Sequence, residues 1–141
     1  MEDIDLARSL LEEDKWNLVI VKKGQVLLSS RERGIAPFFQ AVQSIGKGLH
    51  NAAVADRIVG SAVAMLCLHA RVRYVYADIL SQGALDMLRK KGVAVNSKTT
   101  VPHISNYDGT DLCPFEKLAE SCQKPSQLLA ALQSLFGEDN Q

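Results

Sequence analysis

The sequence predicts an α/β protein, built as a three-layer α-β-α sandwich around a mixed sheet. Two short apolar stretches near the N-terminus are separated by a tight turn, which is typical of an antiparallel hairpin. Helical and strand-like segments then alternate, which is typical of a sheet with helices on both faces. The chain of 141 residues is long enough to form one domain with a substantial core.

The first elements are a short helix and the hairpin. Residues 3–14 place apolar side chains at helical spacing, which predicts an amphipathic helix. The expected strands are 16–21 and 25–30, and Lys23 with Gly24 forms the turn between them.

A second helix is expected between Pro37 and Gly46, where apolar residues again recur at helical spacing. The following residues, Gly46, Lys47 and Gly48, resemble a phosphate-binding loop only superficially. Such a loop needs a strand before it and a serine or threonine after the lysine.

The rest of the chain is organised around a strongly apolar stretch, which we expect to form a buried helix over about residues 56–70. Its polar residues, Asp56, Arg57 and Ser61, crowd at its start. The free N–H groups and the charge at such a start indicate a place for a ligand. Asp56 also has a purely structural interpretation as the helix cap. Gly60 inside a helix costs about 1 kcal/mol relative to alanine, so either another element or a ligand should approach it closely.

The second half of the chain continues the alternation. Ser81 is the expected N-cap of one helix and Gly92 its C-terminal glycine. The expected elements are strands over 72–79, 93–95 and 99–104, helices over 82–91, 114–122 and from Pro125 onward, and a frayed tail over 137–141.

Composition and charge argue against several classes of protein. Sixteen basic residues balance sixteen acidic ones, which argues against a nucleic-acid partner. The longest apolar run is too short to cross a bilayer, and the acidic N-terminus is not a signal peptide. Three cysteines without paired spacing suit a reducing compartment, so a cytoplasmic location without a membrane partner is expected. The scattered histidines, His50, His69 and His103, form no metal-binding motif.

Four further residues are candidates for a site near the end of the chain. Cys113 precedes Pro114 at a helix start, where the pKa of a thiol is lowered, and Glu116 lies one turn further on. A nucleophile with an acid/base is one interpretation, and a small buried residue with a capping glutamate is the other. Asn106 and Asp108 lie in a polar loop, where they serve either a ligand or the turn itself.

Four motifs, at residues 56–62, 81–85, 101–109 and 113–116, carry a resemblance to a known family. Together they resemble prokaryotic proteins of unknown function that are similar in fold to cytidine deaminases. The resemblance implies a deaminase-like sandwich over about residues 15–120. Zinc deaminases place His/Cys-x-Glu and Pro-Cys-x-x-Cys at the starts of two helices. Here residues 56–60 and 81–84 hold those places and offer no zinc ligands, so the resemblance implies the fold without the zinc chemistry.

The combined expectation is a zinc-free domain that binds a nucleotide-related ligand, such as an ADP-ribose-like one, where the helices headed by Asp56 and Ser81 converge. The alternative is a non-catalytic, oligomeric interaction or regulatory module with a relic pocket, which a second apolar face on residues 128–136 would favour. No metal or cofactor is expected. The catalytic candidates are Asp56, Cys113 and Glu116, and the ligand-binding candidates are Gly60, Ser61, Ser81, Gly83, Asn106 and Asp108.

Overall fold

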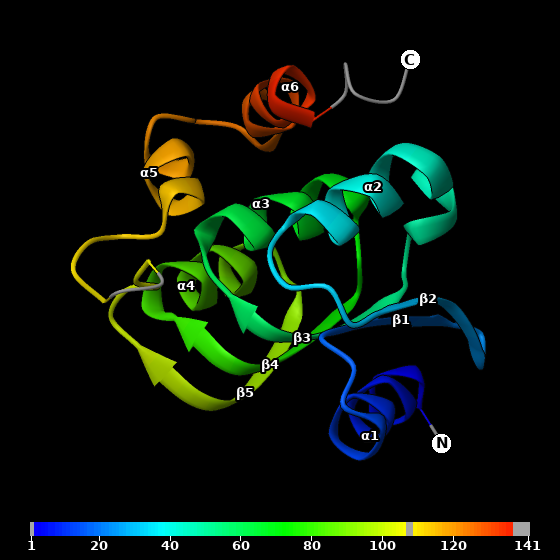
Figure 1. The fold of residues 1–141 in the computed structure, drawn as a ribbon. Coiled ribbons are helices and arrows are strands. Elements are labelled where there is room, and N and C mark those ends of the chain that lie inside the picture. The colour runs from blue at the N-terminus through cyan, green and yellow to red at the C-terminus, as the bar shows by residue number, and fades with distance from the viewer. Residues whose placement is uncertain (1, 107–108, 137–141) are drawn as a thin grey trace.

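The core of the fold is a five-stranded sheet in the order β2-β1-β3-β4-β5 (Figure 1). Strand β1 is antiparallel to both of its neighbours, while β3, β4 and β5 run parallel to one another. The computed structural model describes residues 2–106 and 109–136. The strands are β1 (Leu18–Lys22), β2 (Gln25–Ser30), β3 (Ala53–Val59), β4 (Tyr74–Ser81) and β5 (Ala94–Val101).

Helices cover both faces of this sheet, which confirms the predicted three-layer α/β sandwich (Figure 1). Helix α1 (Asp3–Asp14) lies alone on one face, where Ala7 and Leu11 pack against apolar residues of β1, β3 and β4. The opposite face carries the larger core and the remaining helices. These are α2 (Ala36–Ile45), α3 (Ser61–Ala70), α4 (Gln82–Lys90), α5 (Pro114–Glu120) and α6 (Pro125–Phe136), with a short 3-10 turn at Gly46–Leu49.

The expected helix over residues 56–70 is wrong in its first third. Residues 53–59 form the central strand β3, and the helix α3 begins only at Ser61. Asp56 and Arg57 are adjacent in β3, so the segment lacks the alternation of apolar and polar residues that is typical of a half-exposed strand. The strand is central in the sheet, with β1 and β4 as its neighbours. Asp56 therefore lies in the middle of a strand and not at a helix start. Gly60 precedes the helix, so it carries no helix-interior penalty.

Two predictions made from local sequence patterns, the hairpin turn and the cap of α4, are confirmed. The hairpin turn is formed by Lys23 and Gly24, both at positive φ. Ser81 caps α4, since its Oγ accepts a hydrogen bond from the N–H of Ala84 at 3.1 Å. One correction concerns β5: the two expected strands, 93–95 and 99–104, are a single strand, because parallel pairing with β4 continues without a break. The predicted frayed tail lies outside the described residues.

No helix within the described residues is long and apolar enough to cross a membrane.

Candidate functional site

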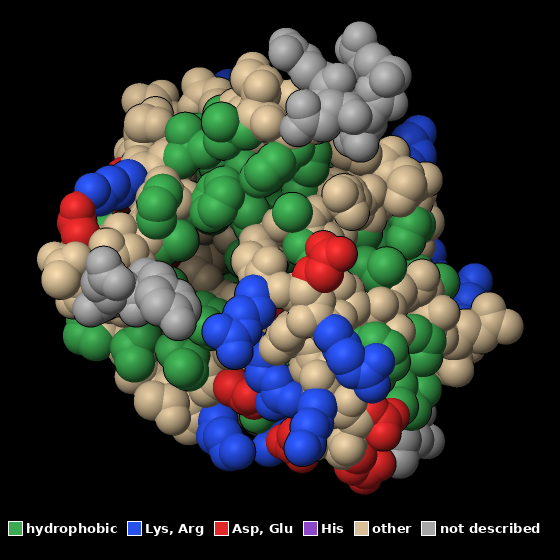
Figure 2. Space-filling model, viewed as in Figure 1, with side chains coloured by type: hydrophobic (Ala, Val, Ile, Leu, Met, Phe, Trp, Pro, Cys, Tyr) green, Lys and Arg blue, Asp and Glu red, His purple; other side chains and the backbone are tan. Residues whose placement is uncertain are grey.

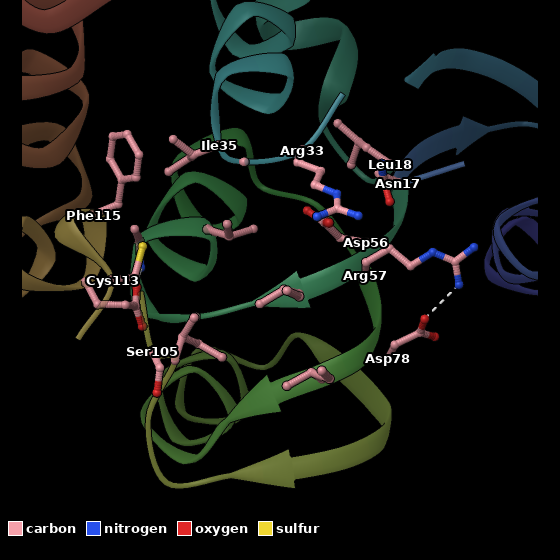
Figure 3. Close-up of a pocket in the computed structure, with 18 of the residues that line it drawn as sticks. Asn17, Leu18, Arg33, Ile35, Asp56, Arg57, Asp78, Ser105, Cys113 and Phe115 are labelled. Carbon is pink, nitrogen blue, oxygen red and sulfur yellow. Dashed lines mark hydrogen bonds and ion pairs between the residues drawn. The ribbon is translucent and has the colours of Figure 1, made fainter. Parts of the chain in front are cut away.

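A cavity of about 530 Å³ opens over the C-terminal halves of β3 and β4 (Figure 3). Its other walls are the start of β1, the loop before α2, the first turn of α3 and the segment that leads into α5. The lining is mixed, with apolar walls and a few polar groups. The apolar part includes Leu18, Ile35, Ile58, Ala62, Val63, Ile79, Ile104 and Phe115, and the polar part includes Asn17, Arg33, Asp56, Arg57, Asp78, Ser105, Cys113 and Glu116.

Asp56 is the most perturbed acid of the cavity. It is paired with Leu18 of β1 and Ala77 of β4, which holds its backbone in the centre of the sheet. Burial raises the pKa of its carboxyl to about 7, and interactions with the N–H groups of Ile58 and Arg57 oppose this rise only in part. A carboxyl with such a pKa is protonated in part at neutral pH, so it can donate as well as accept a hydrogen bond or a proton.

The side of the sheet that Asp56 faces follows from Cys67, a core residue of α3. Burial, with a contribution from the charge of Asp56, raises the pKa of the Cys67 thiol. The carboxyl of Asp56 therefore points toward the face that carries α3.

Glu116, unlike Asp56, is held by hydrogen bonds from the start of a helix. Its carboxylate accepts hydrogen bonds from the first two N–H groups of α3, from Ser61 at 2.8 Å and from Ala62 at 3.0 Å. The side chain is almost fully buried, with 8% of its residue surface exposed. Glu116 thus caps a helix 55 residues away in sequence, and not the helix α5 in which it lies. A negative charge at a helix N-terminus is electrostatically favourable, and free N–H groups there need an acceptor.

Gly60 makes this cap possible. A Cβ atom at this position would lie 2.2 Å from Oε1 of Glu116. The Glu116 side chain would then have to move. The backbone angle φ of Gly60 is −105°, so any residue could adopt its conformation. Of the two alternatives that the sequence left open for Gly60, close approach by another element is therefore the one present in the structure.

Several polar residues of the cavity were not predicted from the sequence, and Asp78 and Arg33 are two of them. Asp78 of β4 forms an ion pair with Arg57 at 2.7 Å and accepts a hydrogen bond from the Tyr76 hydroxyl at 3.1 Å (Figure 3). The sequence signal that could have identified Asp78 is a charged residue inside an otherwise apolar strand. Arg33, in the exposed loop before α2, carried no such signal, because nothing in the local sequence distinguishes it from a surface arginine.

The remaining candidates divide into those in the cavity and those outside it. Cys113 lies on the cavity wall just before α5 (Figure 3). Ser61, Ser81 and Gly83 do not line it, although the starts of α3 and α4 do meet: a Cβ on Gly83 would lie 3.1 Å from Oγ of Ser61.

Asn106 serves its own loop, because its Oδ1 accepts a hydrogen bond from the N–H of Thr110 at 3.1 Å. Asp108 lies outside the described residues. Among the residues that the structure does describe, no group of three or more His, Cys, Asp or Glu side chains is placed to hold a metal ion.

Comparison with known proteins places the chain in a family. A solved DUF1893 family protein (TM1506) from Thermotoga maritima superposes with a TM-score of 0.86 and 24% identity, covering 95% of this chain and 90% of that one. A chain from a study of A-to-I editing by tRNA:A34 deaminases at the wobble position of transfer RNA has a TM-score of 0.45 and 19% identity, covering 67% of this chain and 87% of that one. No curated protein matches. The family described as TM1506, domain of unknown function (DUF1893), matches residues 6–136, and the chain belongs to it.

Proposed function

We propose that this DUF1893 domain binds a nucleotide-related small molecule, such as an ADP-ribose-like one, in the cavity above β3 and β4. The observation that carries the proposal is a cavity of about 530 Å³ that contains a half-buried carboxyl, Asp56, with a pKa of about 7.

The size and lining of the cavity favour a small organic ligand. Pockets for such ligands usually measure about 300–1,000 Å³ and combine apolar walls with a few polar groups that fix the orientation. Ile58 and Ile79 of the sheet and Phe115 in the first turn of α5 provide apolar surface for a flat ring. The position also fits, because open sheets with parallel strands bind ligands beyond the carboxyl ends of those strands.

Asp56 is the group best suited to recognise the ligand. A carboxyl that exchanges a proton near neutrality offers a donor and an acceptor side by side, and the edges of nucleobases present the complementary pattern. The same property would let Asp56 act as an acid or base, with Cys113 on the opposite wall as the candidate nucleophile.

Glu116 plays a supporting part in this proposal. Its two oxygens already accept hydrogen bonds from Ser61 and Ala62, so proton transfer through Glu116 would require breaking the cap of α3. The start of α3 is closed for the same reason, so the ligand site lies beside this helix start and not on it.

The alternative, an oligomeric interaction module, has one observation in its favour. Leu135 on α6 is 58% exposed, whereas Leu128 and Leu132 of the same helix are buried. A single exposed leucine does not make a second apolar face, so the cavity carries more weight.

The proposal is tested by thermal shift and isothermal titration with ribonucleosides, their 5′-monophosphates and ADP-ribose. Wild-type protein should be stabilised by at least one of these, and Asp56→Asn should lose most of that ligand-induced shift. Asp86→Asn is the matched control, because Asp86 is an exposed carboxylate on α4 outside the cavity. Absence of any stabilisation, or an equal shift in wild type and Asp56→Asn, would contradict the proposal.

A further inference from the structure

Charged groups of both signs line the cavity, and Glu32 lies beside Arg33 in the exposed loop before α2. Asp56 and Glu116 place carboxyl groups in its inner part, on β3 and at the start of α3. Arg33 lies at the exposed mouth, in the loop before α2, and extends into the cavity on the side of Asp56 (Figure 3). Figure 2 shows Lys and Arg side chains gathered on this face of the molecule, beside a hollow.

The second arginine of the cavity, Arg57, uses three of its five guanidinium donors in bonds within the protein. Its guanidinium donates to Asp78 at 2.7 Å, to the carbonyl of Leu11 at 2.6 Å and to the carbonyl of Trp16 at 3.0 Å. These bonds tie β3 to α1 and to the start of the hairpin. By contrast, Arg33 makes no hydrogen bond or ion pair with any other residue that the structure describes, although its guanidinium carries five donors.

The inner part of the cavity is unfavourable for an anion. The N–H groups of Ser61 and Ala62, which would otherwise attract one, are already bonded to the carboxylate of Glu116. A phosphate placed there would face this carboxylate at close range in a poorly solvated site, where like charges repel strongly.

We infer that the cavity binds its ligand in one orientation, with an uncharged hydrogen-bonding ring inward at Asp56 and an anionic group, such as a phosphate, outward at Arg33. This inference rests on the proposed function and specifies the ligand class further: an amphiphilic molecule with one neutral end and one anionic end. A guanidinium binds phosphate oxygens through paired, charge-assisted hydrogen bonds, which is the chemistry required at the mouth.

The experiment compares a ribonucleoside with its own 5′-monophosphate by isothermal titration at fixed ionic strength. Wild-type protein should bind the monophosphate about tenfold more tightly than the nucleoside, as expected for one charge-assisted contact. Arg33→Gln should abolish this preference, so that the ratio of the two affinities falls to about one. Arg89→Gln, at an exposed arginine of α4 outside the cavity, controls for the change in net charge and should keep the preference.

The outcomes separate the two proposals. Equal affinity for nucleoside and monophosphate in wild type, or a preference that survives Arg33→Gln, would overturn the orientation and leave the proposed function standing. If neither compound binds, and no other nucleotide in the panel does, the proposed function fails and the orientation fails with it.

Discussion

Two carboxyl groups line the same cavity, and the protein treats them in opposite ways. Glu116 accepts two backbone hydrogen bonds of 2.8 and 3.0 Å at the start of α3. For Asp56, on the central strand, interactions with the N–H groups of Ile58 and Arg57 offset the effect of burial only in part, and its pKa rises to about 7. Both groups are acidic and both are at least partly shielded from water, so burial alone does not determine their roles.

The difference shows how to separate a structural acid from a functional one. A buried carboxylate with its full set of donors stabilises the charged form and fixes the elements that it joins. A carboxyl whose hydrogen bonds do not offset its burial is less stable in the charged form and has hydrogen-bonding capacity left for a ligand. The following predictions test this contrast, from the largest expected effect to the smallest.

The largest effect is expected for Gly60→Ala. The new Cβ would lie 2.2 Å from Glu116 Oε1, so the cap of α3 must break, at a cost of about 3 kcal/mol in the free energy of unfolding. Urea denaturation measures this loss.

Two controls assign that loss to the contact with Glu116. In a Glu116→Ala background the further cost of Gly60→Ala should fall below about 1 kcal/mol, because the obstructing side chain is gone. Gly83→Ala should be tolerated, since its Cβ would meet only the Ser61 hydroxyl at 3.1 Å. If the cost at Gly60 is the same with and without Glu116, the contact is not its cause.

The next effect is a gain in stability for Asp56→Asn at alkaline pH. The folded-state pKa of about 7 lies above the ordinary value of 3.8, so the folded protein binds the proton more tightly than the unfolded chain does. The stability of wild type should therefore fall as pH rises from about 4 to 7 and level off above that range.

Asparagine cannot ionise, so the variant lacks this fall. At pH 8 it should be more stable than wild type, and at pH 4 the difference should nearly vanish. Urea denaturation across this range provides the comparison. A parallel pH dependence of both proteins would show that Asp56 titrates normally.

A smaller loss is expected for Glu116→Gln. The amide keeps one acceptor oxygen but loses the charge that favours the start of α3, so the free energy of unfolding should fall by about 1.5 kcal/mol. Equal stability of Glu116→Gln and wild type would contradict the importance of the charge.

The smallest effect is expected for Asp78→Asn, at a third carboxylate of the cavity. Its ion pair with Arg57 is partly solvated, with side-chain exposures of 21% and 30%, so its loss should cost about 1 kcal/mol. Added salt should weaken the wild type toward the variant. A loss as large as that of Gly60→Ala would indicate a more central role for this ion pair.

The elements with a local signature could be predicted from the sequence. The hairpin rests on the turn at Lys23 and Gly24, and α4 rests on the cap at Ser81, which involve neighbours in the chain. The junction of β3 with α3 could not be predicted. Asp56 and Arg57 interrupt the alternation of a strand, and the residues after Gly60 are apolar on nearly every side of the helix, so neither periodicity is visible across residues 53–68. As a result, the sequence predicts Asp56 at the start of a helix, whereas it lies within β3.

The membership of the candidate site could be predicted only in part. Four of the nine candidate residues, Asp56, Gly60, Cys113 and Glu116, line the cavity, and their roles stay predictions. The bond from Glu116 to the start of α3 joins residues 55 positions apart and depends on the tertiary fold. Gly60 was its one trace in the sequence, since an unexplained glycine indicated a close approach without naming the partner.

The central claim, that Asp56 is the titrating group of the cavity, is tested most directly by a ¹³C NMR titration of its carboxyl carbon, assigned with Asp56→Asn. The claim predicts a midpoint at about pH 7 in the folded protein. A midpoint near the ordinary aspartate value of 3.8 would show that the carboxyl is well solvated, and would contradict the separation of roles between Asp56 and Glu116.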